Sequence, residues 1–503
     1  MTVFGRLLDL PVLVILMGVC CVCMVLPAAY AVALGQFDVA RAFFYSGSVL
    51  FVFTAVIAIA TASYRPVASV QHLLVAVIGA YFILPVILAV PLHQALPEIS
   101  FRAAWFEMLS AFTATGASVF QTPVIVADSL HFWRALVGWL GGYYGLLLVT
   151  TALAPLGLGG VELFGGSTAA KAGFARQTAR LVDPTQRMFH FAGILFPVYA
   201  GITLALWVAL LMAGDTALVA LCHAMGTISA SGISPVSGLG DAPSGRVGEA
   251  IIFFGLAFAL TRRLWPVAGM TDPSIKLWRD PELGLALGIL VLMTSILIMG
   301  QSEVLGQSSS ARTAAAVFQN IWGALFTSLS FLTTTGFQSG DWPALGAPGL
   351  FLVGLAMIGG GVATTAGGIK LLRVYALLRH GERELERIVH PHSIGGHGPV
   401  ARRLRREGAY LAWIFFMVFG LSIAMVIVAL TLTGIDFQSA LILGLACLTT
   451  TGQLAAVVSE TPIGYAGLGS GQMLILGMAM ILGRLEILAV AIVLVPKGWS
   501  RQA

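Results

Sequence analysis

The phrase TATGA at residues 113–117 recurs three times further along this chain of 503 residues, as SASGI (229–233), TTTGF (333–337) and TTTGQ (449–453). Each of these glycine phrases follows an apolar stretch that is too short to cross a bilayer. Their glycines, separated by 116, 104 and 116 residues, are Gly116, Gly232, Gly336 and Gly452. A single Thr-Gly pair is ordinary loop punctuation, whereas four copies in one hydropathic context indicate an internal repeat.

Backbone chemistry suggests a common use for the glycine phrases. Glycine adopts positive φ without a steric penalty, so the carbonyl groups beside it can turn toward a shared axis. Four converging phrases would form rings of carbonyl oxygens, which replace the hydration shell of the ion in potassium filters. The residues expected to line such a filter are Thr113, Ala114, Thr115, Gly116, Ser229, Ala230, Ser231, Gly232, Thr333, Thr334, Thr335, Gly336, Thr449, Thr450, Thr451 and Gly452.

The composition is that of a membrane protein. Hydrophobic residues make up 58% of the chain and charged residues 10%, and the mean hydropathy is +0.94. The five cysteines lie in apolar segments without the spacing of a zinc site or of a disulfide framework, so we interpret them as packing residues. The first apolar run, residues 11–34, exceeds the roughly 7–15 residues of a secretory signal core and indicates a retained helix.

The apolar runs predict an all-α polytopic membrane protein in which two leading helices precede four pore units around a pseudo-fourfold pore. Each unit has a long helix, a short re-entrant pore helix, a glycine phrase and a second long helix. The leading helices are expected in 1–66 and the units at 67–188, 189–279, 280–406 and 407–503. The expected helices span 11–34, 42–62, 67–91, 101–112, 132–155, 190–213, 216–228, 248–265, 282–300, 313–332, 349–378, 409–433, 437–448 and 472–495.

The short helices have polar residues near their starts, namely Ser100, Asp215, Ser310 and Asp436. We expect these side chains to cap the helices, because an N-cap oxygen accepts a hydrogen bond from an otherwise unpaired backbone N–H. Helices that begin at the outer surface and point inward would direct their negative C-terminal ends at the pore centre, where they favour a cation.

The distribution of basic residues predicts the orientation. With the N-terminus inside, ten full spans return the C-terminus to the same side and leave the glycine phrases outside. Of the 27 Lys and Arg residues, 21 then lie inside, Arg484 lies within a span, and five lie outside. The outside residues are Arg41, Arg102, Arg134, Arg246 and Arg312. The positive-inside rule therefore predicts that both termini are cytoplasmic.

This pattern resembles the superfamily of Trk, Ktr and HKT potassium transporters, and within it the TrkH type, the membrane subunit of the bacterial Trk system. The resemblance rests on the four glycine phrases, WLGGYYG at 139–145, GGGVATTAGGIKLLR at 359–373 and GRLEI at 483–487. It covers essentially the whole chain. It implies potassium uptake down the electrochemical gradient, through a pore in the bacterial inner membrane that binds potassium at the filter residues named above. Family members with glycine in all four phrases are associated with selectivity for potassium over sodium.

The resemblance also implies partners. Two membrane subunits would pair as a homodimer, and a cytosolic TrkA-like ring that binds NAD or ATP/ADP would dock on the inner face. No cofactor is expected on this chain, because it has no Rossmann fingerprint between a strand and a helix. Membrane lipids are expected contacts and nucleic acid is not. The basic segment 379–407 is either part of this docking face or a solvated, inside-positive loop.

The last long helix of the third unit is interrupted by residues that suit a helix poorly. They are Gly359, Gly360, Gly361, Thr364, Thr365, Gly367 and Gly368, followed by Lys370. Each interior glycine costs roughly 1 kcal/mol relative to alanine, and irregular backbone at membrane depth persists only inside protein or beside water. These glycines could serve packing alone. The family resemblance instead implies an intramembrane loop that obstructs the pore below the filter and moves to open it.

A further gating candidate is Arg484, which we expect near the middle of the helix at 472–495. A cation there costs roughly 2.5–3.5 kcal/mol on insertion scales unless it faces protein, water or a partner. One interpretation is a structural ion pair with a carboxylate from another helix. The matching arginine of the family suggests the other, a fixed charge beside the pore or the gating loop.

Two other function classes are less consistent with the sequence. A sodium- or proton-linked symport of another solute would also use broken helices, but normally with inverted repeats and ionisable groups at the midplane. Here the repeats run parallel and few acidic residues lie in the expected spans. A membrane enzyme would need a catalytic cluster, and the sequence has no paired carboxylates, helical zinc motif or elbow serine.

Overall fold

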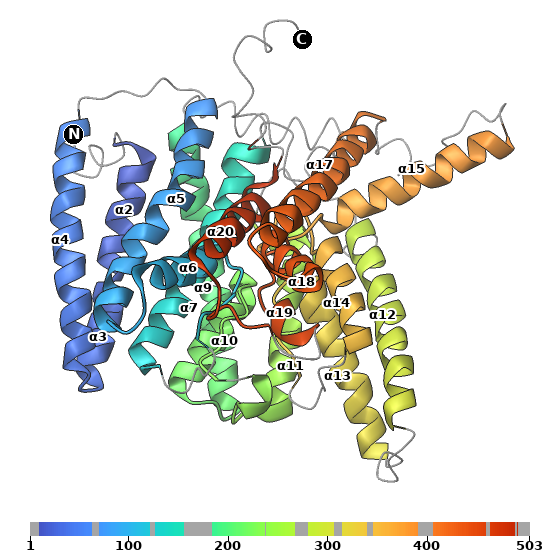
Figure 1. Ribbon diagram of the computed structural model, residues 1–503, viewed down its shortest axis with the longest axis horizontal. Coiled ribbons are helices and arrows are strands. Elements are labelled where there is room, and N and C mark those ends of the chain that lie inside the picture. The colour runs from blue at the N-terminus through green and yellow to red at the C-terminus, as the bar shows by residue number, and fades with distance from the viewer. Residues whose placement is uncertain are drawn as a thin grey trace, which may run out of the picture.

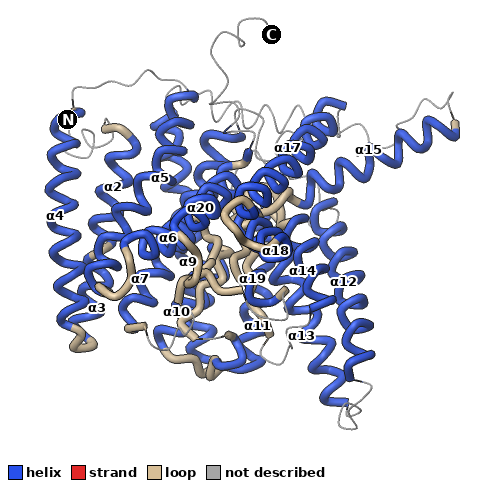
Figure 2. Tube along the Cα trace, in the orientation of Figure 1, coloured by secondary structure: helices blue, strands red, loops and turns tan. Residues whose placement is uncertain are grey.

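The computed structural model describes residues 10–62, 70–120, 126–154, 184–236, 238–266, 280–305, 314–339, 346–390, 406–458, 463–487 and 490. These residues form helices and loops, and none of them forms a strand (Figure 2). The helices form one assembly, and loop backbone gathers in its middle (Figures 1 and 2). The predicted all-α membrane fold is therefore confirmed.

The helices follow the predicted order. The leading helices are α2 (Val12–Cys23), α3 (Val25–Ala33) and α4 (Phe37–Thr61). They are followed by α5 (Val70–Ala95), α6 (Phe101–Phe112) and α7 (Asp128–Leu148), and then by α9 (Pro184–Met212), α10 (Ala217–Ser229) and α11 (Gly245–Leu256). Next come α12 (Pro281–Leu305), α13 (Ala314–Leu332), α14 (Gly346–Ile358) and α15 (Leu371–Val389). The last are α17 (Arg406–Thr431), α18 (Phe437–Leu448), α19 (Leu454–Val457) and α20 (Ser470–Leu485).

Seven stretches of the described residues are long and apolar enough to cross a membrane: Val12–Ala33, Phe37–Thr61, Leu73–Ala95, Asp128–Leu153, Gln186–Met212, Pro281–Gly300 and Ala409–Thr431. They correspond to seven of the ten expected spans. The remaining three correspond to α11, to α14 with α15, and to α20, which are shorter because their backbone is interrupted. Length and composition together identify a membrane protein.

The second long helix of every unit is irregular. A π-helical turn at Val149–Leu153 follows α7, α11 gives way to 3₁₀ turns, a loop separates α14 from α15, and α20 ends before Glu486, which has φ +60°. Continuous helices over 248–265 and 472–495 were therefore wrong predictions. The hydropathy of a segment indicates whether it is buried, but an apolar segment stays apolar where its helix is broken. Hydropathy therefore could not locate these breaks. Arg484 consequently lies in the last turn of α20, directly before the break in the helix.

The short helices α6 and α18 have the predicted bounds and caps. The Ser100 hydroxyl accepts from the Ala103 N–H, and the Asp436 carboxylate accepts from the Ser439 N–H, which holds the Asp436 pKa below its ordinary value. The prediction for Asp215 was wrong, because Thr216 occupies the N-cap of α10 without a side-chain bond. Asp215 instead accepts from the Ser244 N–H at 2.8 Å. The predicted cap Ser310 lies outside the described residues.

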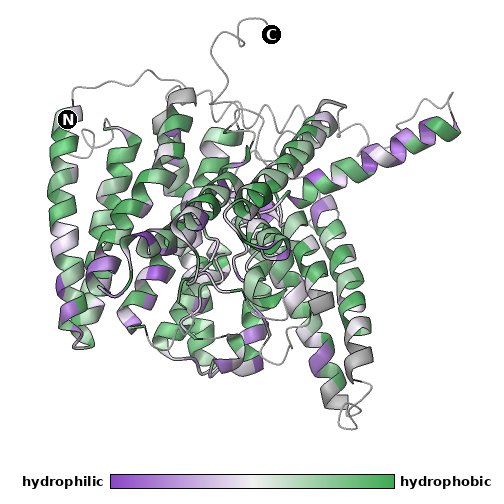
Figure 3. Ribbon diagram, viewed as in Figure 1, coloured by the Kyte–Doolittle hydropathy of each residue, from purple (hydrophilic) through white to green (hydrophobic). Residues whose placement is uncertain are grey.

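The basic segment 379–407 begins as helix rather than loop. The helix α15 continues to Val389 and projects away from the other helices (Figure 1). Hydrophilic and hydrophobic residues are mixed along it, whereas the spanning helices are predominantly hydrophobic (Figure 3). Ion pairs three residues apart join Arg379 to Glu382 and Glu384 to Arg387, and such pairs support an exposed helix.

Burial separates the helices around the centre from those at the periphery. In α7, 83% of the apolar window is buried, compared with 17% in α12. The exposed side chains of α12 include Leu287, Val291 and Leu292, as suits a helix that faces lipid. The second long helix of the first unit therefore lies against the middle of the molecule, where the glycine phrases are found.

Candidate functional site

The four glycine phrases end their short helices with the same backbone turn. The second residue of each phrase is left-handed, with φ between +54° and +57° at Ala114, Ala230, Thr334 and Thr450. The third residue donates its N–H to the carbonyl five residues earlier, over 2.8–3.0 Å in all four phrases. This is the Schellman pattern, in which a left-handed residue terminates a helix. Sequence reasoning missed it, because none of the four left-handed residues is a glycine.

The hydroxyl groups of the phrases hold this turn in place. The first residue of each phrase donates to the carbonyl four residues earlier, at 2.8–3.0 Å, from Thr113, Ser229, Thr333 and Thr449. Its hydroxyl also pairs with that of the third residue, at distances from 2.8 to 3.4 Å. The small hydroxylated residues thus fix the backbone from which the carbonyl groups project.

Each glycine places its phrase directly against the next one. A Cβ atom on Gly116 would lie 2.1 Å from the Ser231 carbonyl oxygen, and one on Gly232 would lie 2.0 Å from that of Thr335. A Cβ on Gly336 would meet Gln453 at 2.9 Å. The Gly452 N–H donates to the Thr115 carbonyl at 2.6 Å, which brings the fourth phrase back to the first. The four phrases therefore form a closed ring.

The role predicted for the glycines needs one correction. Gly116, Gly232 and Gly336 have positive φ, of +71°, +60° and +80°, whereas Gly452 does not. What all four positions share is the lack of space for a side chain, since Gly452 would place a Cβ 2.3 Å from the Ala117 nitrogen. Close packing around the ring is therefore the common requirement, and positive φ is needed at three positions.

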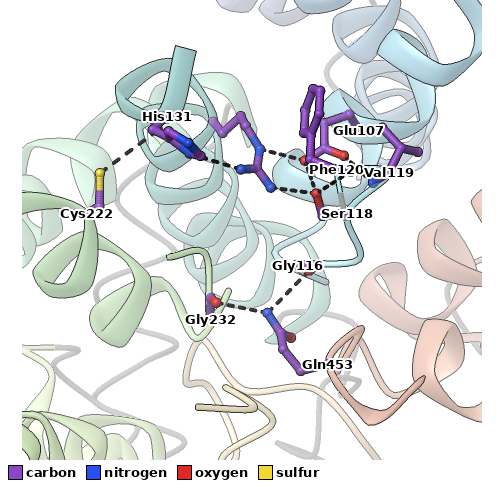
Figure 4. Close-up of polar contacts among 10 residues, drawn as sticks. Glu107, Gly116, Ser118, Val119, Phe120, His131, Cys222, Gly232 and Gln453 are labelled. Carbon is purple, nitrogen blue, oxygen red and sulfur yellow. Dashed lines mark hydrogen bonds and ion pairs between the residues drawn. The ribbon is translucent and has the colours of Figure 1, made fainter. Parts of the chain in front are cut away.

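One cavity of about 450 Å³ opens onto the ring and is lined by all four phrase glycines. Beside it, Arg134 of α7 forms an ion pair with Glu107 of α6 at 2.6 Å, and both side chains are almost fully buried. The Glu107 carboxylate also accepts from the Val119 N–H at 2.8 Å, and the Arg134 guanidinium donates to the Ser118 hydroxyl (Figure 4). This network fixes the backbone that leaves the first phrase.

Other groups hold the segments that leave the second and third phrases. His223 of α10 is 2.9 Å from the Ser234 hydroxyl, two residues beyond Gly232. The Glu249 carboxylate of α11 accepts from the Ser339 hydroxyl at 2.9 Å, three residues beyond Gly336. Polar side chains on the helices thus anchor three of the four exits from the ring, with different chemistry at each.

The loop between α14 and α15 lies against the opposite side of the ring from the cavity. The Gly367 N–H donates to the Thr334 hydroxyl at 2.7 Å. A Cβ atom on Gly367 would lie 2.2 Å from the Thr450 hydroxyl and 2.4 Å from the Thr449 carbonyl oxygen. The loop backbone therefore packs directly against the third and fourth phrases.

The base of the loop is tied to itself and to neighbouring helices. The N–H groups of Ile369 and Lys370 donate to the carbonyls of Met357 and Ile358, both at 2.9 Å. Gly359, with φ +74°, packs against Gly367 and Gly368. The two ends of the interruption are thus held together, and the loop is an ordered structure rather than a flexible linker.

The first half of the loop lies against the irregular end of α11. The Gly361 N–H and the Thr364 hydroxyl both donate to the Ala259 carbonyl, at 2.9 and 3.1 Å. Gly360 also approaches this carbonyl closely, since a Cβ there would lie 2.5 Å from its oxygen. The buried Glu282 carboxylate accepts from the Val362 N–H at 3.1 Å and from Arg262 at 2.7 Å. The break in α11 thus supplies a backbone acceptor to the loop.

Arg484 reaches the loop from the other side. Its guanidinium donates to the Thr365 carbonyl at 2.6 Å and to the Gly142 carbonyl at 3.5 Å. Glu486 is not its partner, as the spacing predicted, because Glu486 pairs with Arg373 at 2.8 Å. Among the described residues no carboxylate pairs with Arg484, and its guanidinium joins the loop to α7 through backbone carbonyls.

Lys370 lies at the end of the loop, where its ammonium group donates to the Ala366 carbonyl. A small cavity of about 30 Å³ is lined by Gly367, Lys370, Arg484 and Glu486, among other residues. A cavity needs roughly 10–15 Å³ of such space to hold one water molecule, so this one is large enough for water. This cavity is far smaller than the cavity of about 450 Å³ on the opposite side of the ring.

The structure brings together all sixteen predicted filter residues in the ring and all nine predicted gating residues in or against the loop. Sequence reasoning missed Gln453, Glu282, Arg262 and the buried pair Arg373–Glu486. Glu282 could have been singled out, because a carboxylate at the start of a membrane span requires a partner. Gln453 could have been singled out by its position directly after a phrase glycine. No feature of the sequence linked either residue to its contacts.

Comparisons with known proteins agree with this geometry. A family model described as "TrkH: Cation transport protein" matches residues 283–502. The chain is 29% identical over 411 residues to the Trk system potassium uptake protein TrkH of Vibrio parahaemolyticus, and 28% identical over 422 residues to TrkH of Escherichia coli K12. Each alignment covers 80% of both chains. TrkG of Escherichia coli K12 is 26% identical over 417 residues.

A solved structure shares the fold along almost the whole chain. It is the crystal structure of the potassium transporter TrkH from Vibrio parahaemolyticus, with a TM-score of 0.80 and 24% sequence identity. The match covers 99% of this chain and 100% of the other. The resemblance that the sequence analysis stated is confirmed in sequence and in fold.

Proposed function

We propose that this chain, a membrane protein related to the TrkH cation transport proteins, takes up potassium through a channel-like pore at the centre of the ring of glycine phrases. It is accordingly a transport protein and not an enzyme. The residues that would bind potassium are the sixteen of the four phrases, through backbone carbonyls held by hydroxyl groups on the outside of each turn.

One observation carries this proposal: the four phrases contact one another in a closed cycle with the same helix-ending turn. Backbone carbonyls arranged in rings can replace the hydration shell of a monovalent cation. Each short helix also directs its C-terminal end, which carries partial negative charge, at the ring. Both features favour a cation without any carboxylate in the ring.

The loop at 359–370 is proposed as the gate. It lies against the third and fourth phrases on the side away from the large cavity. Distinct hydrogen bonds join it to the 3₁₀ turn that follows α11, to α12 and to α20. Opening requires the loop to leave the Thr334 hydroxyl and the Arg484 guanidinium. Arg484 adds fixed positive charge that opposes cation occupancy behind the filter while the loop is closed.

The location, the oligomeric state and the regulation of the protein are also proposals. The protein would lie in a bacterial inner membrane with both termini in the cytoplasm. It would pair as a homodimer, and nucleotide control, through NAD or ATP/ADP, would come from a cytosolic TrkA-like ring, since the chain itself offers no nucleotide fingerprint. The amphipathic helix α15, which projects from the other helices, offers an exposed surface for such a partner.

Rubidium uptake into liposomes that contain the purified protein tests the pore. Potassium is expected to inhibit rubidium entry and sodium is not. The Gly232→Ala variant is expected to lose this preference, because the added Cβ would lie 2.0 Å from the Thr335 carbonyl oxygen. The matched control is Gly420→Ala in α17, where a Cβ meets nothing within 4 Å.

Two results would contradict the proposal. One is rubidium entry that responds neither to potassium nor to the Gly232 substitution. The other is entry that occurs only when a sodium or proton gradient is imposed, which would favour the coupled transporter instead.

A further inference from the structure

The side chain of Gln453 lies across the cavity side of the ring. Gln453 is the last residue of the fourth phrase, and its amide nitrogen donates to the Gly232 carbonyl at 2.8 Å and to the Gly116 carbonyl at 3.3 Å (Figure 4). It also covers the third phrase, since a Cβ on Gly336 would lie 2.9 Å from its Cβ and Oε1 atoms. One side chain therefore contacts three phrases while belonging to the fourth.

The orientation of this amide follows from its partners. Carbonyl oxygens only accept hydrogen bonds, so the atom that faces two of them must be the –NH₂ group. The Gln453 Oε1 atom is then buried and has no hydrogen-bond partner among the described residues. A buried acceptor without a partner is unfavourable, so the amide is held in this place less strongly than its two hydrogen bonds suggest.

The amide nitrogen occupies a position that suits a cation. It carries partial positive charge and lies between glycine carbonyls of the first and second phrases, where the large cavity meets the ring. Among the described residues, those that line this cavity include Arg134 and no carboxylate. The described part of the lining therefore offers backbone and side-chain dipoles, and the Arg134 guanidinium, rather than an anionic group.

We propose that Gln453 is a tethered cap whose amide occupies the outermost cation position of the filter and is displaced by an arriving potassium ion. This proposal rests on the proposed function, because it requires the ring to bind cations. The cap competes with every cation equally, because the amide binds the carbonyl oxygens and makes no contact with the ion. It therefore weakens apparent affinity from the cavity side and leaves the choice between potassium and sodium unchanged.

The test is the concentration dependence of rubidium uptake, in liposomes, of the wild type, Gln453→Ala and Gln453→Met. Alanine removes the amide, and methionine keeps the length of the side chain without a donor. Both variants remove the hydrogen bonds of the amide, whose net free energy is about 1 kcal/mol. Rubidium then no longer has to displace the amide, so the KM for rubidium is expected to fall about fivefold. Potassium is expected to remain the preferred competitor. The control is Gln338→Ala, a second glutamine on the same cavity wall for which the structure gives no hydrogen bond to a phrase carbonyl.

The outcomes separate this proposal from the proposed function. An unchanged KM in both variants, with uptake that potassium still inhibits, overturns the cap alone. Loss of the preference for potassium in both variants, but not in Gln338→Ala, shows that Gln453 is a structural support and also overturns the cap. Wild-type uptake that ignores potassium overturns the proposed function and the cap with it.

Discussion

Single glycines decide how closely the helices approach the ring. A Cβ on Gly141 of α7 would lie 2.0 Å from the Phe112 carbonyl oxygen, and one on Gly483 of α20 would lie 2.1 Å from that of Leu448. These carbonyls end α6 and α18 at equivalent positions. In the same way, Gly145 leaves room for the Arg484 guanidinium, since a Cβ there would lie 2.6 Å from it. The glycines of the motifs WLGGYYG and GRLEI are therefore required for close packing of α7 and α20 against the ring and the loop.

The contact between the loop and the ring can be tested with Gly367→Ala. Its Cβ would overlap the Thr450 hydroxyl and the Thr449 carbonyl, and such overpacking costs about 1–3 kcal/mol. Because this cost falls on the closed loop, rubidium uptake by the isolated protein should rise about fivefold or more. Gly354→Ala in α14, where a Cβ meets nothing within 4 Å, should leave uptake unchanged. Reduced uptake without inhibition by potassium would mean that the filter itself is distorted.

At the scale of elements, the interruptions in the long helices serve one arrangement. The break after Leu256 in α11 exposes the Ala259 carbonyl, which accepts from the loop. The end of α20 at Leu485 places Arg484 against the loop and Glu486 against Arg373. Arg373 also lies over the Phe415 ring, 3.8 Å from its centroid. Irregular backbone at this depth is tolerated because other protein groups satisfy it.

The contact between α12 and the loop can be weakened by a substitution that keeps the shape of the Glu282 side chain. Glu282→Gln keeps an acceptor for the Val362 N–H but removes the charge that faces Arg262. Hydrogen bonds to a charged group are roughly twice as strong as neutral ones, so a loss of about 1–2 kcal/mol is expected. Rubidium uptake without a cytosolic partner should then rise about 5–30-fold. The exposed Glu98→Gln is the control, and unchanged uptake in a monodisperse Glu282→Gln preparation would refute this role.

For the whole molecule, the two sides of the ring differ in access. The cavity on one side measures about 450 Å³, whereas the cavity beside the loop measures about 30 Å³. The loop packs against the ring on the side of the smaller cavity. In terms of the gate proposed above, this arrangement corresponds to the closed position of the loop.

The proposed orientation predicts which surfaces a membrane-impermeant thiol reagent reaches in intact cells. Glu98→Cys, between α5 and α6, should react from outside, and Val389→Cys, at the exposed end of α15, should react only after permeabilisation. Of the native cysteines four are buried and Cys23 is partly buried, so the wild type provides the background. Reaction of Val389→Cys alone in intact cells would reverse the orientation.

The sequence by itself determined the class of protein, the order of the helices and the positions of the four phrases. Hydropathy and spacing are local properties, and they survive any arrangement of the helices. Only the tertiary structure decided where the long helices break, that Ala114 and its three counterparts are left-handed, and that Gln453 lies across the ring. The position of Gln453 and the contacts made at the helix breaks depend on segments more than a hundred residues apart, whereas the left-handed turns are held by local hydrogen bonds that no glycine marks in the sequence. No pattern along the chain records such contacts.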